Sequence, residues 1–290
     1  MRATHLIVRR FLEAEGGRVS YLTVDGAQAP ETLLLIHGAG VSARTWVNQL
    51  RGLTDALRPI AIDLPGRCGS DPTSDPTLAT YAHIACQALE RLHTGPVFVA
   101  GHSLGGGVAQ LLAMRHPDKV KGLILISTCA KVPPADGAMK LFGFVPPPFR
   151  RVVLLWMSGR VLFAPSTSWQ AIQLTLNEIR DCRLATLQSD AAVGRAMDLV
   201  STAQRLRVPT LILCGGRDRL TVPALSQQLN ALIPGSRLEI VPSAGHMLPL
   251  EAPEIVNRTI RDFVHTVTPE VAVRHGLRRL LRRLAGWGRV

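Results

Sequence analysis

The chain has 290 residues, of which 47% are hydrophobic, and its formal net charge is +12. Its length suits one large α/β domain or two small ones with a substantial core, and its apolar content excludes a disordered chain. The charge does not indicate nucleic-acid binding. Six arginines in residues 274–289 supply half of it, and no zinc-finger or aromatic-basic RNA motif accompanies them.

The cysteines and the lack of long apolar segments predict a cytoplasmic protein. The five cysteines are widely spaced and form no CxxC pair, which indicates free thiols in a reducing compartment: Cys68, Cys86, Cys129, Cys182 and Cys214. The start of the chain lacks the apolar run of a signal peptide. No later segment reaches the roughly eighteen apolar residues of a membrane-spanning helix.

The first elements in the chain are two β-rich runs that predict a hairpin, Val8–Ala14 and Val19–Val24. Further strands are predicted by apolar runs at Leu33–Ile36, Pro59–Ile62, from Val97 onward and at Gly122–Ser127. Helical patterns between them are carried by Trp46, Leu50 and Leu53, by the apolar face from Tyr81 to Leu92, and by Leu104–Arg115. This alternation predicts parallel strands with helices on both faces of the sheet.

Between residues 131 and 207 the alternation lapses, and an inserted helical cap over the strand ends is expected. The segment holds four of the seven phenylalanines, together with Trp156 and Trp169. Its helical patterns lie near Trp169–Arg180 and Ala191–Ala203. Strands are predicted again at Pro209–Cys214 and Arg237–Pro242, and a helix at Pro253–Val267 closes the domain.

The predicted organisation therefore has four parts. The α/β core comprises residues 1–130 and 208–268, the cap or lid comprises residues 131–207, and a basic amphipathic tail comprises residues 269–290. In a parallel sheet the loops at the carboxyl ends of the strands hold the site. The sequences HGAG, DLPGRCGSD, GHSLG and STCA all fall at such ends.

One of these loops, Gly-His-Ser-Leu-Gly, carries the candidate nucleophile. Ser103 stands where an apolar strand turns sharply into a helix, and glycines lie two positions on either side of it, where strand and helix pass close together. Its hydroxyl is expected above the sheet at the positive end of the helix. Backbone N–H groups there can stabilise developing negative charge.

A serine hydroxyl needs a base and an orienting carboxylate to act as a nucleophile at neutral pH. His246 lies four residues beyond the last predicted strand, in a loop that contains glycine. Asp218 follows the Pro209–Cys214 strand, whereas the loop Ser-Thr-Cys-Ala after Gly122–Ser127 offers no acid. The alternatives are a loop or capping histidine, and an aspartate that caps a helix or pairs with an arginine.

Taken together, these motifs resemble the α/β-hydrolase fold over most of Val8–Val267. The matching pieces are HGAG, GHSLGG, GGRD and AGHMLPLEAPE in that order. The resemblance implies a mostly parallel, doubly wound, eight-stranded sheet with an inserted helical cap. It also implies Ser103 as nucleophile, His246 as general base and then acid, and Asp218 as the orienting carboxylate.

The same resemblance implies an oxyanion hole made by the backbone N–H groups of Ala39 and Leu104, with Gly40 as the alternative to Ala39. His37 is expected to be a structural loop residue. One departure is that Cys68 stands where the family has a second glycine, so Gly69 is expected to absorb the turn. A nucleophilic Cys68 is the weaker alternative, since no histidine is placed beside it.

The chemistry implied is attack on a carbonyl through an acyl-serine, with no metal and no organic cofactor. Ser103 at the sharp turn between strand and helix, the nucleophile elbow, argues against relatives that open epoxides or displace halide, because those carry aspartate at this position. The apolar cap residues favour a small-molecule ester with an apolar acyl or alkyl group: Leu141, Val152, Leu154, Leu155, Met157 and Leu162. The alternative is that they only bury the cap on the core.

The predicted function is thus a serine carboxylesterase or small lipase. A carbon–carbon bond hydrolase or lactonase is the alternative within the enzymes, and a low-turnover small-molecule receptor the alternative outside them. In the tail, one apolar stripe faces flanking arginines: Leu277, Leu280, Leu281, Leu284 and Trp287. That pattern is typical of a helix on an anionic membrane surface, with docking on the core or disorder as alternatives.

Overall fold

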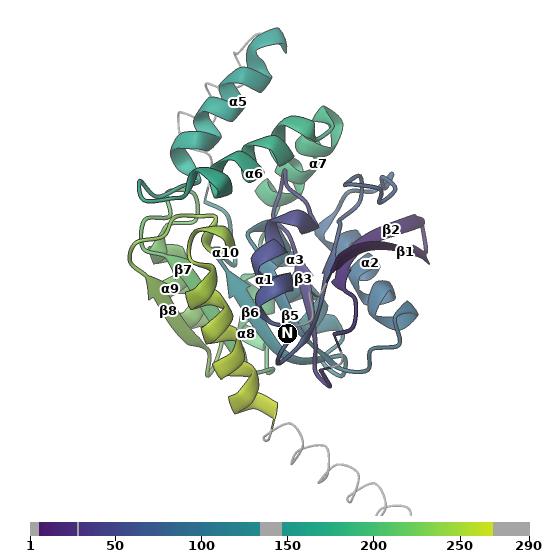
Figure 1. The fold of residues 1–290 in the computed structure, drawn as a ribbon. Helices are drawn as coiled ribbons and strands as arrows, with labels where there is room; N and C mark the ends of the chain where they lie inside the picture. The colour runs from purple at the N-terminus through teal and green to yellow at the C-terminus, as the bar shows by residue number, and fades with distance from the viewer. Residues whose placement is uncertain (1–5, 28, 134–146, 269–290) are drawn as a thin grey trace, which may run out of the picture.

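The computed structural model describes residues 6–27, 29–133 and 147–268. Eight strands in this part form one sheet in the order β1-β2-β4-β3-β5-β6-β7-β8 (Figure 1). Their bounds are β1 Ile7–Ala14, β2 Gly17–Val24, β3 Thr32–Ile36, β4 Arg58–Ile62, β5 Val97–His102, β6 Val120–Ile126, β7 Thr210–Gly215 and β8 Arg237–Val241.

The predicted hairpin and the predicted parallel sheet are both confirmed. β1 and β2 pair antiparallel from Ile7 opposite Val24 to Ala14 opposite Gly17, and β2 pairs antiparallel with β4. All remaining neighbours, from β4 through β3 to β8, pair in parallel. The carboxyl ends of these six strands therefore meet at one edge of the sheet.

Helices cover both faces of the sheet, as the alternation predicts. The helices are η1 Ala43–Trp46, α1 Val47–Gly52, α2 Leu78–Arg91, α3 Leu104–Arg115, α5 Pro147–Val161, α6 Trp169–Asp181, α7 Leu184–Arg195, α8 Val200–Arg205, α9 Pro223–Leu232 and α10 Leu248–Glu251. A further helix covers residues 253–268. In the described part of the chain, no helix is both long enough and apolar enough to cross a membrane.

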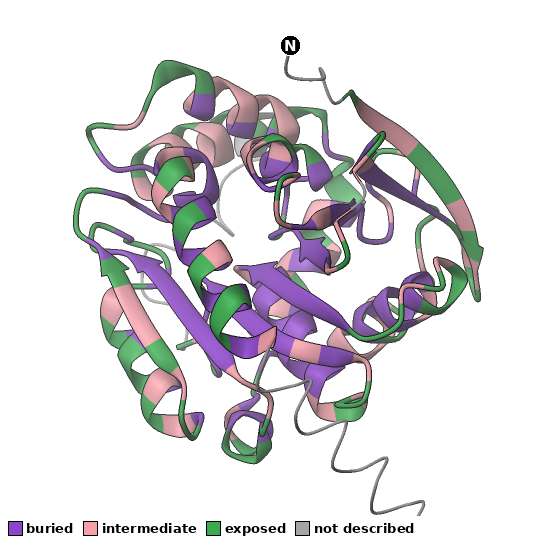
Figure 2. Cartoon of the chain, turned by 60° about the horizontal axis from the view of Figure 1, so that its bottom comes forward, coloured by how far each residue is buried: buried purple, intermediate pink, exposed green. Residues whose placement is uncertain are grey.

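Alternate residues of each central strand point to opposite helical layers. In β3, Leu34 and Ile36 join a core with α2, α3, α8 and α9, whereas Leu33 and Leu35 join a core with η1, α1 and helix 253–268. Both faces of the central strands are accordingly buried (Figure 2). This double burial explains why these strands read as continuous apolar runs.

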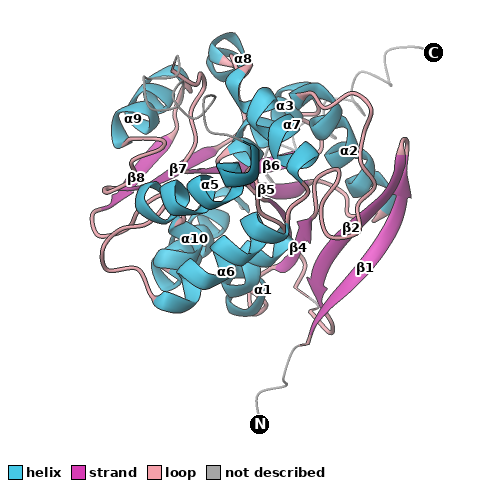
Figure 3. Cartoon of the chain, turned by 90° about the horizontal axis from the view of Figure 1, so that it is seen from above, coloured by secondary structure: helices cyan, strands magenta, loops and turns pink. Residues whose placement is uncertain are grey.

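The helices α5, α6 and α7 lie together at one end of the sheet, in front of it when the molecule is viewed from above (Figure 3). Contacts place α7 over the carboxyl ends of the strands, since a Cβ added to Gly40 after β3 or to Gly66 after β4 would meet Leu187 or Thr186 of α7. The bounds of the cap as a separate unit stay a prediction.

The single helix predicted over Ala191–Ala203 is wrong. α7 ends at Arg195, and a separate helix α8 begins at Val200 and packs against α3 and α9. Between them the Leu199 N–H donates to the Ala130 carbonyl, and Lys131 forms an isolated bridge with Asp198. The chain returns to the core at this point because the loop after β6 offers hydrogen bonds that a continuing helix would forgo.

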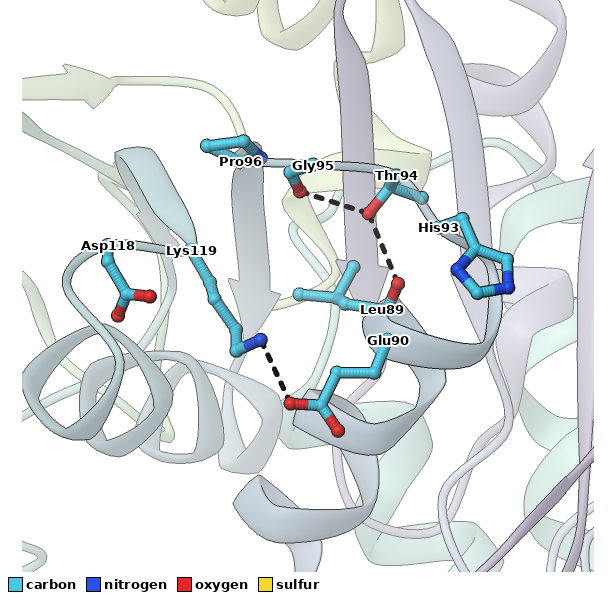
Figure 4. Close-up of a pocket in the computed structure, with 8 residues that line it drawn as sticks. All are labelled: Leu89, Glu90, His93, Thr94, Gly95, Pro96, Asp118 and Lys119. Atoms are coloured by element: carbon cyan, nitrogen blue, oxygen red, sulfur yellow. Dashed lines mark hydrogen bonds and ion pairs between the residues drawn. The ribbon is translucent and has the colours of Figure 1, made fainter. Parts of the chain in front are cut away.

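One hollow of the surface lies at the amino ends of β5 and β6 (Figure 4). It is lined by the end of α2, by Pro96 before β5, and by Asp118 and Lys119 before β6. Lys119 Nζ lies 2.9 Å from Glu90 Oε1 there. These segments stand at the amino ends of β5 and β6, opposite to Ser103, so we assign the hollow no part in the chemistry.

Candidate active site

Ser103 occupies the apex between β5 and α3 in a left-handed backbone conformation, with φ of 53° and ψ of −119°. Its flanking glycines are required by close packing, because a Cβ on Gly101 would overlap the Gly105 carbonyl. A Cβ on Gly105 would in turn overlap the Ile36 carbonyl of β3. Strand, turn and helix therefore approach closely enough to hold a serine in a conformation that it rarely adopts.

Backbone hydrogen bonds on both sides fix this apex. The Ser103 N–H donates to the Ile126 carbonyl at 3.0 Å, and its own carbonyl accepts from Gly106 N–H and from the Thr128 hydroxyl, each at 2.8 Å. The Ser103 side chain is partly exposed and has no hydrogen-bond partner among the described residues. Its hydroxyl is thus available to a substrate.

The structure brings Asp218 and His246 together. Asp218 follows β7 and His246 follows β8, and His246 Nδ1 lies 2.9 Å from Asp218 Oδ2. Both side chains are buried. Neither alternative predicted for Asp218 is found among the described residues: the N-cap of α9 is Val222, and no arginine pairs with the carboxylate. Its Oδ1 instead accepts from the N–H groups of Leu220 and Thr221 at 2.8 Å each, in a local turn.

The hydrogen bonds around Asp218 keep its carboxylate ionised. Burial raises the pKa of the carboxyl, but the adjacent His246 and the hydrogen bonds from His246, Thr221 and Leu220 together outweigh it, so the net pKa lies below the ordinary value. Thr221 Oγ1 donates to Oδ2 at 2.7 Å, and Oδ2 also meets the imidazole. A charged, fully bonded carboxylate orients the ring through Nδ1–H.

His102, immediately before Ser103, places His246 beside the elbow. The centroids of the two rings are 4.9 Å apart, and His102 Nε2 donates to the His246 carbonyl at 2.9 Å. Burial and the neighbouring His246 lower the pKa of His102 to about 3. His102 is therefore neutral at physiological pH, and it supports the His246 backbone.

The HGAG loop after β3 packs against the elbow. A Cβ on Gly38 would lie 3.0 Å from His102 Nδ1 and 3.2 Å from Ser103 Cβ, tighter than most Cβ contacts, so glycine lets the backbone come near without crowding. Within the described residues, the N–H groups of Ala39 and Leu104 donate to no acceptor. Gly40 N–H instead donates to Asp190 Oδ2 at 3.1 Å, which removes Gly40 as the alternative oxyanion donor.

Comparison with known proteins agrees with this geometry. The model of the alpha/beta hydrolase family matches residues 33–259. The chain belongs to the alpha/beta hydrolase family. A relative, a pimeloyl-[acyl-carrier protein] methyl ester esterase of Neisseria meningitidis serogroup C, is 30% identical over 254 residues, covering 82% of this chain and 95% of that one.

Among solved structures, this alpha/beta hydrolase is similar to a thermophilic esterase, with 29% identity, a TM-score of 0.79 and coverage of 91% of this chain and 99% of that one. An enol-lactonase from Burkholderia xenovorans shares the fold, with a TM-score of 0.77 at 22% identity over 88% of this chain and all of that one. These likenesses establish a hydrolase of this family without a specific substrate.

The structure also describes three other loop residues that were singled out in the sequence, His37, Cys68 and Gly69. His37 uses both ring nitrogens on the backbone, since Nδ1 lies 2.8 Å from the Gly38 carbonyl and Nε2 accepts from Leu64 N–H at 2.9 Å. Cys68 is an exposed free thiol with φ of 42°, and Gly69 has φ of 119°. Gly69 thus has the positive φ expected of the residue that absorbs the turn, and Cys68 beside it adopts a positive φ as well.

The cap aromatics of the hydrolase do not all face the core. Trp156 and Trp169 are 58% and 67% exposed, and Val152 is exposed as well. Among the cap aromatics whose burial the structure describes, Phe163 is buried, and it packs with Met247 and Leu250 next to His246. Composition indicates an apolar cap but not which face of each helix turns inward. Leu141 and the predicted tail, residues 269–290, lie outside the described residues.

Four polar residues near the site were missed at the level of sequence. Thr221 had a usable signal, since Asp followed three residues later by Thr is typical of a side-chain capped turn. Asp190 had a weaker one, as the acid on the buried face of α7 with Thr186 and Val193. Arg67 and Glu251 had no signal in the sequence that marked them as part of the site. In the described part of the chain, no group of three or more His, Cys, Asp or Glu side chains could hold a metal ion.

Proposed function

We propose that this hydrolase cleaves carboxylic esters through an acyl intermediate on Ser103. The observation that carries the proposal is the buried Asp218–His246 pair, joined at 2.9 Å and set beside the strained serine by the His102 ring. A histidine fixed at Nδ1 by a carboxylate presents Nε2 as a base. The Ser103 hydroxyl has no hydrogen-bond partner among the described residues, so it is free to be activated by such a base.

The proposed reaction runs in two halves. His246 Nε2 takes the Ser103 proton as Oγ attacks the ester carbonyl, and the oxyanion forms against the N–H groups of Ala39 and Leu104. The C–O bond to the alcohol then breaks as His246 returns the proton to the leaving oxygen. Water repeats the sequence on the acyl-serine, releasing the acid and restoring Ser103. Asp218 stabilises the imidazolium that forms twice in each cycle.

Esters with apolar acyl or alkyl groups are the proposed substrates. The similarity to two esterases at 29% and 30% identity supports ester cleavage. The part-buried apolar residues Leu154, Leu155 and Leu162 in and after α5, and the cluster around Phe163, support an apolar group. A preference for medium acyl chains over acetate is the corresponding expectation.

The test is hydrolysis of p-nitrophenyl butyrate by the wild type and by Ser103→Ala, with fluorophosphonate labelling and peptide mapping of the modified residue. Ser127→Ala is a matched control, because Ser127 is also a left-handed serine at the end of a neighbouring strand but is fully buried. We expect Ser103→Ala alone to abolish turnover and labelling. Unchanged turnover in Ser103→Ala, or a label on another residue, overturns the proposal.

The same assay separates the rival functions. A wild type that is labelled at Ser103 but hydrolyses lactones or β-diketones in preference to esters would be a lactonase or a carbon–carbon bond hydrolase. A protein that binds small apolar molecules without labelling or turnover would be a receptor. Rates with p-nitrophenyl acetate, butyrate and octanoate then test the preference for apolar chains.

A further inference from the structure

The cap helix α7 sits on two loops that frame the site. Its Thr186 packs against Gly66 of the loop after β4, and its Leu187 packs against Gly40 of the loop after β3. Both glycines have a left-handed backbone, with φ of 78° and 77°. A Cβ on Gly66 would lie 2.9 Å from Thr186 Oγ1 and a Cβ on Gly40 would lie 3.2 Å from Leu187 Cδ2, so both loops approach the helix closely.

Asp190, one turn further along α7, is the only acid on the buried face of that helix, and it is 2% exposed. Its Oδ2 accepts from Arg67 Nη2 at 2.6 Å and from Gly40 N–H at 3.1 Å. Its Oδ1 accepts from the Tyr81 hydroxyl of α2 at 3.1 Å. One carboxylate thus joins the cap, both loops and a core helix.

The charges in this cluster balance. Arg67 is 4% exposed and supplies the positive charge that a carboxylate buried to this degree needs. Burial and the adjacent Asp190 raise the pKa of Tyr81 above its ordinary value, so its hydroxyl remains a donor. Asp190 is therefore held in place by Arg67 and by Tyr81, and its third hydrogen bond, from Gly40 N–H, is the one that reaches the active-site loop.

Gly40 directly follows Ala39, whose N–H is proposed above to hold the oxyanion. Fixing the Gly40 amide fixes the peptide plane between Ala39 and Gly40, and with it the direction of the loop. Catalytic donors must be held to within about half an ångström of their working position. Ala39 itself is exposed, and the Gly40 bond to Asp190 holds the loop one residue beyond it, whereas the His37 ring holds the loop on the strand side.

We propose that Asp190 is a positioning residue for the oxyanion hole. It holds the Ala39 loop through its hydrogen bond to Gly40. The geometry of the oxyanion hole therefore depends on the packing of the cap helix α7 against this loop. This inference rests on the proposed function for its kinetic consequence. The loop geometry that it assigns to Asp190 can be measured without any turnover.

The experiment compares two double variants that both remove the buried ion pair. Arg67→Met with Asp190→Asn keeps an acceptor oxygen for Gly40 and an amide that can donate to Tyr81. Arg67→Met with Asp190→Leu keeps a similar volume but offers no acceptor. Neither variant leaves a buried charge unpaired, so they differ in the hydrogen bonds to Gly40 and to Tyr81, of which only the first reaches the active-site loop.

We expect the Asn variant to retain kcat on p-nitrophenyl butyrate within about threefold of the wild type. The Leu variant should lose about 10- to 100-fold in kcat with KM within about threefold, because an oxyanion donor acts in the transition state and not in substrate binding. If Asp190 had a merely structural role, kcat would fall equally in both variants, or KM would change. Equal kcat in the two variants overturns the proposal.

Exchange of the Gly40 amide, followed by NMR in D₂O, provides the second readout. It should accelerate at least about tenfold in the Leu variant and little in the Asn variant. If the wild type hydrolyses no ester, the proposed function fails, and this exchange difference alone decides whether Asp190 holds the loop. Equal exchange in the two variants overturns the inference.

If either double variant does not fold, Asp190→Asn alone replaces the pair. Arg67 then competes with Gly40 for the single acceptor oxygen, so kcat and Gly40 protection should fall together. Wild-type kcat alongside a rapidly exchanging Gly40 amide would overturn the inference.

Discussion

Asp218 and His246 are 28 residues apart in sequence, and their side chains meet at 2.9 Å between Oδ2 and Nδ1. The contact is not isolated, because the Thr221 hydroxyl donates to the same oxygen and two backbone N–H groups bind the other. Every side of the carboxylate that faces the protein is therefore used, and the ring of His246 has one orientation in which Nδ1–H is bonded.

Replacing Asp218 by Asn tests this orientation. The Asn amide would present N–H groups toward Nδ1 and favour the tautomer that carries its proton on Nε2, where a base must be free. We expect kcat on p-nitrophenyl butyrate to fall about 10³- to 10⁴-fold, the size of effect seen when a triad carboxylate becomes an amide. Near-UV circular dichroism checks the fold. A loss below tenfold contradicts the assigned role.

Thr221→Val tests the supporting hydroxyl. The substitution keeps the shape but removes the 2.7 Å donor to Asp218 Oδ2, so the carboxylate can turn and its pKa should rise toward the ordinary value. We expect kcat to fall about tenfold, in line with the loss of an outer partner of a functional group. Thr221→Ser keeps the hydroxyl and is the control. If the Ser and Val variants lose kcat equally, the hydroxyl is not the cause.

Much of the framework could be predicted from local pattern. The strands β3 to β7 are short, mostly apolar runs because helices cover both of their faces, and such runs stand out in a sequence. The Gly-His-Ser-Leu-Gly turn is equally local, since Gly101 and Gly105 are required within four residues of each other. Asp218 and His246 follow strands whose carboxyl ends share an edge, so topology alone brings them near.

The remainder depends on contacts that no local pattern encodes. Asp190 binds Gly40, which is 150 residues earlier, and Arg67, which is 123 residues earlier. After α7 ends at Arg195, the chain returns to the core, where Leu199 N–H donates to the distant Ala130 carbonyl. Trp156 is an exposed residue in an apolar segment, and composition gave no indication of its face.

The elbow glycines make a prediction about folding. Gly105→Ala would force a Cβ into the Ile36 and His37 carbonyls, which are backbone atoms that cannot rotate away. We expect a loss of about 3 kcal/mol or more in the free energy of unfolding, at the upper end of single-residue effects. Urea denaturation followed by circular dichroism measures it.

Gly194→Ala is the matched control for this loss. Gly194 lies in α7 with nothing within 4 Å of an added Cβ, so alanine should stabilise the helix by about 0.5–1 kcal/mol. A Gly105→Ala protein as stable as the wild type would show that strand and helix at the elbow can separate, and would contradict the close approach described here.

Glu251 makes a prediction about the His246 loop. Its Oε2 accepts from Gly245 N–H and Ala164 N–H at 2.9 Å each, so it ties the loop before His246 to the segment between α5 and α6. Glu251→Gln keeps one acceptor oxygen and should lower kcat only a fewfold. Glu251→Leu leaves both N–H groups unpaired, and we expect a loss of about 1–3 kcal/mol in stability. Equal unfolding free energies for the two variants would contradict this role.

His102 predicts a pH dependence of stability. Its pKa is lowered to about 3 in the folded protein, from an ordinary value of 6.5. Below pH 6.5 the unfolded chain therefore binds a proton that the folded protein does not. This difference lowers the free energy of unfolding by up to about 1.4 kcal/mol per pH unit as the pH falls from about 6.5 toward 3. Above pH 6.5 the contribution of His102 is constant.

His102→Gln isolates this contribution. The Gln amide can still donate to the His246 carbonyl but cannot take up a proton, so the slope of unfolding free energy against pH between 4.5 and 6.5 should become shallower. Part of the slope should remain, because burial also lowers the pKa of His37. Urea midpoints at several pH values measure it. A uniform offset with an unchanged slope would mean that His102 is protonated in the folded protein, and hence that the ring beside His246 carries a charge.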